Sequence, residues 1–179
     1  VDGHKESLRR YRDSLIARCR RLGVKFQLGT TATREYIQQM HPDAVICAVG
    51  SSPARPPIPG IEKAHHALYC YDRPEAVGKK VIMIGGGLIG CETGYWLADT
   101  GHQVHVLEMR EDLAMDALPS HRAALLPRMA KTMSWNCSVT VTEVTDNGVK
   151  FTDQDGQEHF LEADTVLYAV GQRANSQTV

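Results

Sequence analysis

Hydrophobic residues recur every three or four positions at the start of the chain, and this spacing predicts a helix over residues 6–22. Arginines fill the opposite face, so the helix is amphipathic. Gly23 stands where a helix C-cap is expected. A second, short helix is predicted from a cap at Thr33 to Met40, because Pro42 follows closely.

Two further segments in this part of the chain have the pattern of strands. Residues 24–28 alternate apolar and polar side chains, and residues 44–49 form a continuous apolar run that ends at Gly50. Such a run is typical of a strand covered on both faces, as in a parallel sheet. Four prolines then fall within residues 51–60, which predicts an extended connector.

From residue 80 the pattern becomes strand, glycine turn, helix and strand, predicted over residues 81–84, 88–100 and 103–107. A further helix over residues 120–133 is expected to be disturbed by Pro127, which lacks an amide hydrogen.

The last part of the chain is predicted to be β-rich. Short strands separated by Asn-Gly and Asp-Gly turns indicate a β-meander, and an apolar strand over residues 165–170 ends at Gly171. Together these elements predict an α/β fold, namely a Rossmann-like, three-layer dinucleotide-binding domain with a β-meander.

Composition narrows the class of protein. A chain of 179 residues buries roughly 70% of its unfolded surface, so it needs no disulfide or metal ion to fold. Twenty basic and twenty-one acidic residues give no electrostatic reason to bind nucleic acid or an anionic membrane. No apolar run approaches the ~20 residues of a membrane span, and the first residues do not have a signal-peptide pattern. We therefore predict a soluble, cytoplasmic protein. Because it starts at Val1 and not at Met, we expect a fragment of something longer.

Cysteines and histidines give no metal or disulfide pattern. The five cysteines are scattered, with no C-x-x-C spacing, which argues against disulfides, zinc and iron–sulfur clusters within this chain. His65, His66 and Cys70 come nearest to a ligand cluster, but no second pair accompanies them. We expect no metal site.

The motif that carries chemistry is a G-x-G-x-x-G formed by Gly85, Gly87 and Gly90 between the predicted strand and helix. In a dinucleotide-binding turn, the first glycine permits the tight bend, the second lets the backbone approach a pyrophosphate, and the third lets the helix pack on the strand. The amides of Leu88 and Ile89 would then face the phosphates at the helix N-terminus. The alternative is a glycine-rich turn in some other α/β protein.

Glu108 ends the next strand, 23 residues after Gly85, where the fingerprint expects an acid that binds the adenosine ribose hydroxyls. A carboxylate there repels a 2′-phosphate, so NAD(H) is favoured over NADP(H). The alternative for Glu108 is a solvated charge. Arg110 either contacts a phosphate or is a surface arginine paired with Glu111 or Asp112.

No catalytic constellation is predicted. The chain lacks the Tyr-x-x-x-Lys pair of a short-chain dehydrogenase, a redox cysteine pair, and a candidate triad. Hydride transfer between two coenzymes requires no acid–base residue, so the chain is predicted to be a binding module.

These motifs resemble the flavoproteins with two dinucleotide-binding domains. The resemblance lies in GGGLIGCE at residues 85–92, SSPARPPIPG at residues 51–60, and the Ala-Val-Gly segments that end at Gly50 and Gly171. The opening helix and Pro42-Asp43-Ala44-Val45 are similar to the C-terminal half of NADH:flavin oxidoreductases of the old yellow enzyme type. That branch includes 2,4-dienoyl-CoA reductases, 2-enoate reductases and trimethylamine dehydrogenase.

The resemblance implies a pyridine-nucleotide domain inserted in a truncated flavin-binding domain. Residues 1–77 would be a partial FAD-binding domain, residues 78–171 the NAD(H)-binding domain, and residues 172–179 the return into the flavin domain. It implies that NADH reduces FAD, and that electrons then pass through a 4Fe-4S cluster to FMN in a barrel outside this chain. There an activated C=C bond or similar group would be reduced.

The resemblance also implies further cofactor contacts. Val49 and Gly50 would approach the flavin, or else simply end a buried strand; Gly171 would lie near NAD, or else be a turn glycine. Two other functions stay open: a stand-alone NAD-binding or redox-sensing module without turnover, and a subunit that borrows its flavin from a partner. The oligomeric state and final substrate are not predicted.

Overall fold

The computed structural model describes residues 5–175 and divides the chain into two compact units. One is Ser52–Arg173, and the other is Val1–Ser51 with Ala174–Val179, of which residues 5–51 and 174–175 are described. Strand β1 (Ser51–Pro53) pairs with β10 (Gln172–Ala174) in a two-stranded sheet, where the chain passes from one unit to the other.

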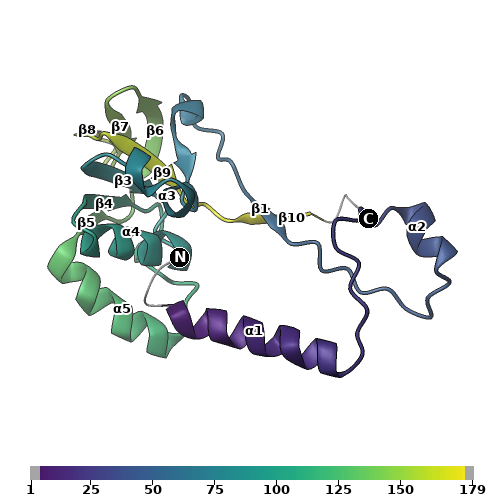
Figure 1. Ribbon diagram of the computed structural model, residues 1–179. Coiled ribbons are helices and arrows are strands. Elements are labelled where there is room, and N and C mark those ends of the chain that lie inside the picture. Colours follow the sequence, from purple (N-terminus) through teal and green to yellow (C-terminus); the bar gives the residue numbers. More distant parts are fainter. Residues whose placement is uncertain (1–4, 176–179) are drawn as a thin grey trace. The chain divides into compact units, whose positions relative to one another are not determined.

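The larger unit is built on a five-stranded sheet in the order β2-β9-β3-β4-β5, with every neighbouring pair parallel (Figure 1). Because all strands run the same way, their carboxyl ends meet at one edge of the sheet. The strands are β2 (His65–His66), β3 (Lys80–Ile84), β4 (Gln103–Leu107), β5 (Ser134–Asn136) and β9 (Thr165–Tyr168).

Helices and a second sheet cover the two faces of this parallel sheet. Side chains alternate along β3, so Val81 and Met83 pack with the helices, while Ile82 and Ile84 pack with the second sheet. This confirms the predicted three-layer, Rossmann-like α/β fold with a β-meander. The helices are α4 (Leu88–Asp99) and α5 (Pro119–Thr132), and the antiparallel strands are β6 (Thr140–Thr145), β7 (Gly148–Thr152) and β8 (Glu158–Glu162).

Short elements connect β1 to the parallel sheet, and their residues belong to the larger unit's cores. Ile61 packs on the meander side, whereas Ala67, Cys70 and Val77 pack on the helix side. The division of the chain into flavin and pyridine-nucleotide parts at residue 77 stays a prediction. The elements are η2 (Ile61–Lys63), α3 (Tyr69–Asp72) and η3 (Pro74–Ala76).

Two details of the larger unit differ from the sequence prediction. Helix α5 continues through Pro127. Strand β5, three residues long and mostly polar, carries too little pattern to be predicted, and it forms because the edge of β4 offers it hydrogen-bond partners.

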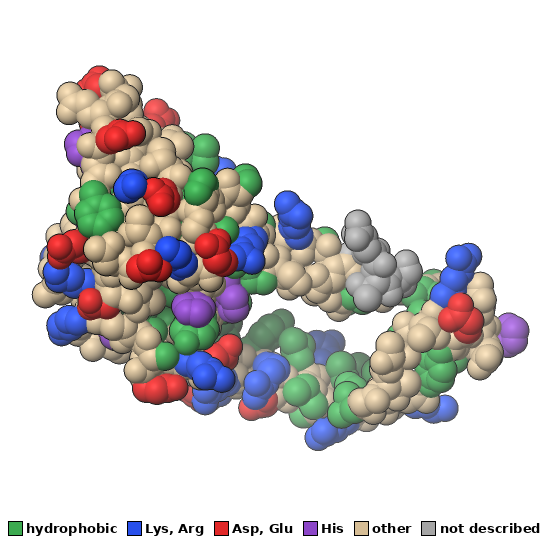
Figure 2. Space-filling model, turned by 90° about the horizontal axis from the view of Figure 1, so that it is seen from above, with side chains coloured by type: hydrophobic (Ala, Val, Ile, Leu, Met, Phe, Trp, Pro, Cys, Tyr) green, Lys and Arg blue, Asp and Glu red, His purple; other side chains and the backbone are tan. Residues whose placement is uncertain are grey.

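The smaller unit contains α1 (Glu6–Arg21) and α2 (Arg34–Gln39), as predicted. Thr33 caps α2 by accepting a hydrogen bond from the amide of Tyr36 at 3.2 Å. No residue described between 5 and 51 is buried, and hydrophobic side chains lie on the surface of this unit (Figure 2).

The predicted strands over residues 24–28 and 44–49 are wrong for this chain. Neither segment forms a strand, and Ile46 is 92% exposed where a side chain covered on both faces was expected. A strand is stable only when its backbone pairs with a neighbour, and no strand in the described residues pairs with either segment.

Among residues 5–175, no helix combines the length and the apolar character that crossing a membrane requires.

Candidate functional site

A cleft of about 530 Å³ opens at the carboxyl edge of the parallel sheet. Its walls are the glycine turn after β3, residues 107–110 at the end of β4, residues 169–171 after β9, and parts of the 56–58 connector and of β6. Ligands of open α/β sheets bind outside the carboxyl ends of the strands, so this cleft lies where a nucleotide is expected.

The geometry of the turn explains two of the predicted glycines. Gly85 has φ +101°, a conformation that side chains disfavour, and a Cβ there would lie 2.5 Å from the Ala169 carbonyl oxygen. A Cβ on Gly90 would lie 2.0 Å from the carbonyl oxygen of Gly85, so α4 packs against the turn more closely than any side chain permits. Gly87, with extended backbone, is the N-cap residue of α4.

The first amide of α4 already has an anionic partner. The amide of Leu88 donates to Oδ1 of Asp116 at 2.9 Å, and Asp116 lines the cleft. The helix leaves the other amides of its first turn, that of Ile89 included, without acceptors of its own. Asp116 could not be predicted from the sequence, because it stands 28 residues from Leu88 and no local pattern links the two.

Glu108 is fixed at the end of β4 and is only 6% exposed. Its Oε2 accepts a hydrogen bond from the amide of Gly86, and its Oε1 accepts one from the amide of Arg110 at 2.8 Å. The alternative of a solvated charge is therefore wrong. Each carboxylate oxygen has a second lone pair, so Glu108 retains capacity to accept from ribose hydroxyls at the cleft.

The Arg110 side chain is exposed and lines the cleft. Asp112 pairs instead with Arg122, and within residues 5–175 no ion pair joins Arg110 to Glu111 or Asp112. The hydrogen bond from the Leu113 amide, and next to it that from the Arg122 guanidinium, hold the pKa of the Asp112 carboxyl below its usual value. A phosphate contact of Arg110 stays a prediction.

Three other predicted cofactor residues lie apart from the glycine turn in the sequence. Gly171 has φ +113° and lines the cleft, and its carbonyl accepts from the amide of Ala54 at 3.0 Å. Val49 and Gly50 belong to the smaller unit, where both carbonyls accept hydrogen bonds from Asn175. They do not end a buried strand, and their contact with flavin stays a prediction.

Two buried cysteines serve packing. Cys70 donates to the carbonyl of Ala67 at 2.9 Å, and Cys91 donates to the carbonyl of Gly86 at 3.1 Å. Burial raises the pKa of each thiol to about 12, so both stay protonated at neutral pH. Neither has the reactivity of a redox centre.

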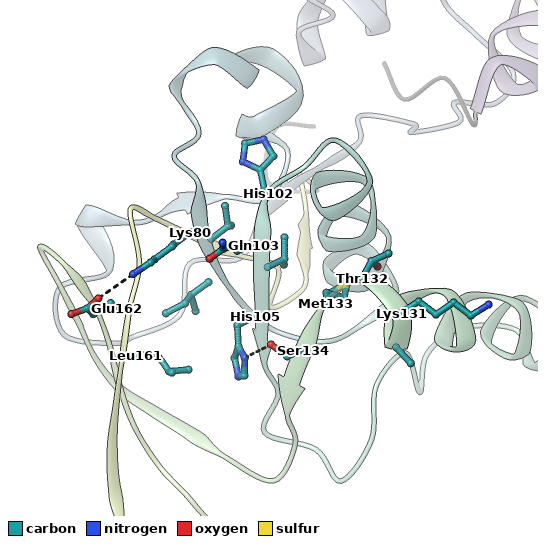
Figure 3. A pocket seen from close by; sticks show the side chains of 14 residues that line it. Lys80, His102, Gln103, His105, Lys131, Thr132, Met133, Ser134, Leu161 and Glu162 are labelled. Carbon is teal, nitrogen blue, oxygen red and sulfur yellow. Dashed lines mark hydrogen bonds and ion pairs between the residues drawn. The ribbon is translucent and has the colours of Figure 1, made fainter.

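A second hollow, of about 700 Å³, lies at the opposite edge of the sheet, where β3, β4 and β5 begin (Figure 3). Several of its polar side chains have partners within the protein. Lys80 pairs with Glu162 at 3.2 Å, and the His105 ring lies 2.8 Å from Ser134 Oγ and from Asn136 Oδ1. Parallel sheets bind nucleotides at the other edge, so we assign no cofactor here.

His105 is expected to make stability depend on pH. Burial lowers the pKa of its imidazole below 6.5, although the hydrogen bond to Asn136 opposes this. Below about pH 6.5 the unfolded chain therefore binds a proton that the folded chain does not, and the free energy of unfolding falls on acidification. Denaturant titrations at pH 7.5 and 5.5 should show a smaller loss for His105→Gln than for the unmodified chain. An equal loss in both would contradict this role.

The fold and the cleft together define a dinucleotide-binding domain: a parallel sheet with a glycine turn, a helix N-terminus and an acid, all at its carboxyl edge. The family model that describes pyridine nucleotide-disulphide oxidoreductases matches residues 6–179. The chain belongs to this family and forms an FAD/NAD(P)-binding domain of it.

Three relatives of the chain have the names of oxidoreductases. The chain is 35% identical over 179 residues to an NADH oxidase of Thermoanaerobacter brockii, covering 94% of this chain and 27% of that protein. It is 33% identical over 154 residues to a cinnamate reductase of Clostridium sporogenes, covering 84% and 23%. A solved structure of 2-naphthoyl-CoA reductase with 2-naphthoyl-CoA superposes with a TM-score of 0.82 at 32% identity, covering 90% and 25%. The chain thus spans about a quarter of these relatives.

Proposed function

We propose that the cleft at the carboxyl edge of the sheet binds NADH. The observation that carries the proposal is the buried carboxylate of Glu108, held by the amides of Gly86 and Arg110 so that it ties the end of β4 to the glycine turn. A fixed acceptor needs no reordering to receive two ribose hydroxyls. The pyrophosphate would then lie against the N-terminus of α4.

The same carboxylate favours NADH over NADPH. In NADPH a phosphate replaces the ribose 2′-hydroxyl, and it would bring a second negative charge next to Glu108. The Glu108 carboxylate is only 6% exposed, so solvent screens this repulsion poorly. Arg110, exposed at the rim of the cleft, is the residue that would offset this repulsion in an NADPH-binding site. Glu108 therefore favours NADH, whereas Arg110 would favour NADPH.

We further propose that the chain is the nucleotide-binding part of an NADH:flavin oxidoreductase of the old yellow enzyme type. NADH bound in the cleft supplies hydride to FAD, and FMN and a 4Fe-4S cluster would lie in parts outside this chain. Val49, Gly50 and Gly171 are the residues we expect nearest to the flavin and nicotinamide. Support comes from the Ala-Val-Gly segments and from relatives named NADH oxidase and cinnamate reductase. An activated C=C bond is the substrate class that this implies.

Calorimetric titration of the 179-residue chain with NADH and with NADPH tests the proposal. The unmodified chain is expected to bind NADH more tightly. In Glu108→Ala, NADH affinity should fall about tenfold or more, because a buried charged acceptor and its hold on the turn are lost together. Arg110→Ala should leave NADH affinity within about twofold, since an exposed rim charge contributes little. A preference for NADPH that Arg110→Ala abolishes would overturn the assignment.

One observation favours a second function, a stand-alone NAD-binding or redox-sensing module without turnover. The unit Ser52–Arg173 has two hydrophobic cores of its own, whereas residues 5–51 contain no buried residue. Under this alternative the chain binds NADH but does not oxidise it when FAD and an artificial electron acceptor are supplied. NADH-dependent reduction of the acceptor that requires FAD would favour the oxidoreductase instead.

A further inference from the structure

A carboxylate lies at the N-terminus of α4, where the proposed function places the pyrophosphate. Oδ1 of Asp116 accepts the amide hydrogen of Leu88 at 2.9 Å. Both carboxylate oxygens also lie 3.4 Å from the position that a Cβ on Gly87 would take. Gly87 is the glycine that lets a backbone approach phosphate closely, and here the group that approaches it is a side-chain anion.

The loop that carries Asp116 is anchored next to it. Leu113 and Ala114 are fully buried, and the amide of Ala114 donates to the carbonyl of Gly86 at 2.7 Å. Ala114 has φ 50°, a left-handed conformation that costs free energy for any residue with a side chain. Arg122 secures the same loop by donating from Nε to the carbonyl of Leu113 at 2.8 Å. The anchored backbone therefore directs Asp116 toward the glycine turn.

We propose that Asp116 is an internal anion that occupies the pyrophosphate position of the nucleotide cleft and thereby sets the affinity for NADH. The inference rests on the proposed function, since it requires NADH to bind there. One amide cannot serve two anions at full strength, and a carboxylate left beside a pyrophosphate repels it. Binding of NADH therefore requires that the hydrogen bond between the Leu88 amide and Asp116 breaks and that the carboxylate moves away from the helix N-terminus. The cost of that exchange makes NADH binding weaker and its release easier than the glycine turn alone would allow.

Asp116→Asn is the discriminating variant, because asparagine keeps the shape and the acceptor oxygen but removes the charge. The dissociation constant for NADH, measured by calorimetry on the 179-residue chain, is expected to fall about fivefold. The matched control is Glu111→Gln, which removes one negative charge from the same loop at a residue that does not line the cleft. It should change the dissociation constant less than about twofold. Inorganic pyrophosphate, titrated in place of NADH, should show the same order of affinities.

A second measurement tests the hydrogen bond between the Leu88 amide and Asp116 in the absence of any ligand. In Asp116→Ala the backbone amide resonance of Leu88 should move and the melting temperature should fall, because a helix N-terminus loses its acceptor. The same variant should bind NADH more tightly than the unmodified chain, so stability and affinity change in opposite directions. If Asp116 had a purely structural role, its replacement would lower both the melting temperature and the affinity for NADH.

The outcomes separate the inference from the proposed function. If the unmodified chain binds NADH and Asp116→Asn binds it equally or more weakly, the inference is overturned while the function stands. An equal gain of NADH affinity in Glu111→Gln also overturns the inference, because removal of any negative charge from this loop would then explain the effect. If neither the unmodified chain nor Asp116→Asn binds NADH, the proposed function fails and the inference fails with it.

Discussion

Gly90→Ala is expected to destabilise the chain by about 2–4 kcal/mol and to abolish NADH binding. The added Cβ would lie 2.0 Å from the carbonyl oxygen of Gly85, a backbone atom that cannot rotate out of the way. Relief requires α4 to move away from the turn. That movement displaces the amides that would face the pyrophosphate, so stability and binding are lost for one reason. Urea unfolding and calorimetric titration with NADH measure the two effects.

Gly94→Ala is the matched control, because it adds the same methyl group to the same helix. There the Cβ would meet Cε of Met133 at 2.9 Å, the far end of a flexible side chain that can move aside. Alanine also favours the helix by about 1 kcal/mol over glycine, which offsets the crowding. The stability of this variant should stay within about 1 kcal/mol of the original and NADH binding should persist. Similar losses in both variants would show that the close approach at Gly90 is not the cause.

Leu107→Ala is expected to lower the free energy of unfolding by about 2–5 kcal/mol, whereas Leu28→Ala should change it by less than about 0.5 kcal/mol. Both leucines end segments that the sequence pattern predicts to be strands. Leu107 is 2% exposed and packs between the parallel sheet and the meander, while Leu28 is 86% exposed. Truncation leaves a cavity only at the first site.

Urea denaturation of the two variants, followed by far-ultraviolet circular dichroism, checks this pair. Because the substitution is the same, differences in helix propensity or unfolded-state solvation largely cancel. Equal losses would mean that Leu28 is buried in solution, which would contradict the exposure of residues 5–51 in the structure.

The proposed coenzyme site could be predicted from the sequence where its residues are close together along the chain. Gly85, Gly87 and Gly90 have the spacing of a strand–turn–helix, and Glu108 follows at the end of the next strand. In the structure Gly85, Gly87 and Glu108 line one cleft, and Gly90 packs against the carbonyl oxygen of Gly85. The pattern works because a tight turn and a close helix impose conditions on backbone conformation that glycine alone meets.

Residues that act across the fold could not be found in this way. Asp116 contacts Leu88 from a loop in which the amide of Ala114 donates to the carbonyl of Gly86, and no spacing in the sequence reveals that contact. The carboxylate of Glu108 was predicted, but its bonds to the amides of Gly86 and Arg110 were not.

The sequence by itself determined the glycine turn, the two N-terminal helices and, apart from strand β5, the order of strands and helices from residue 80 onward. These features depend on local periodicity and on the conformational freedom of single residues. Only the tertiary structure decided whether an apolar segment becomes a strand. Residues 103–107 pair with β3, and Val104, Val106 and Leu107 are buried. Residues 44–49 are all apolar, yet no strand of the described residues pairs with them and they stay exposed. The physical reason is that a strand's hydrogen bonds are made to another segment, so its own residues supply only half of the structure.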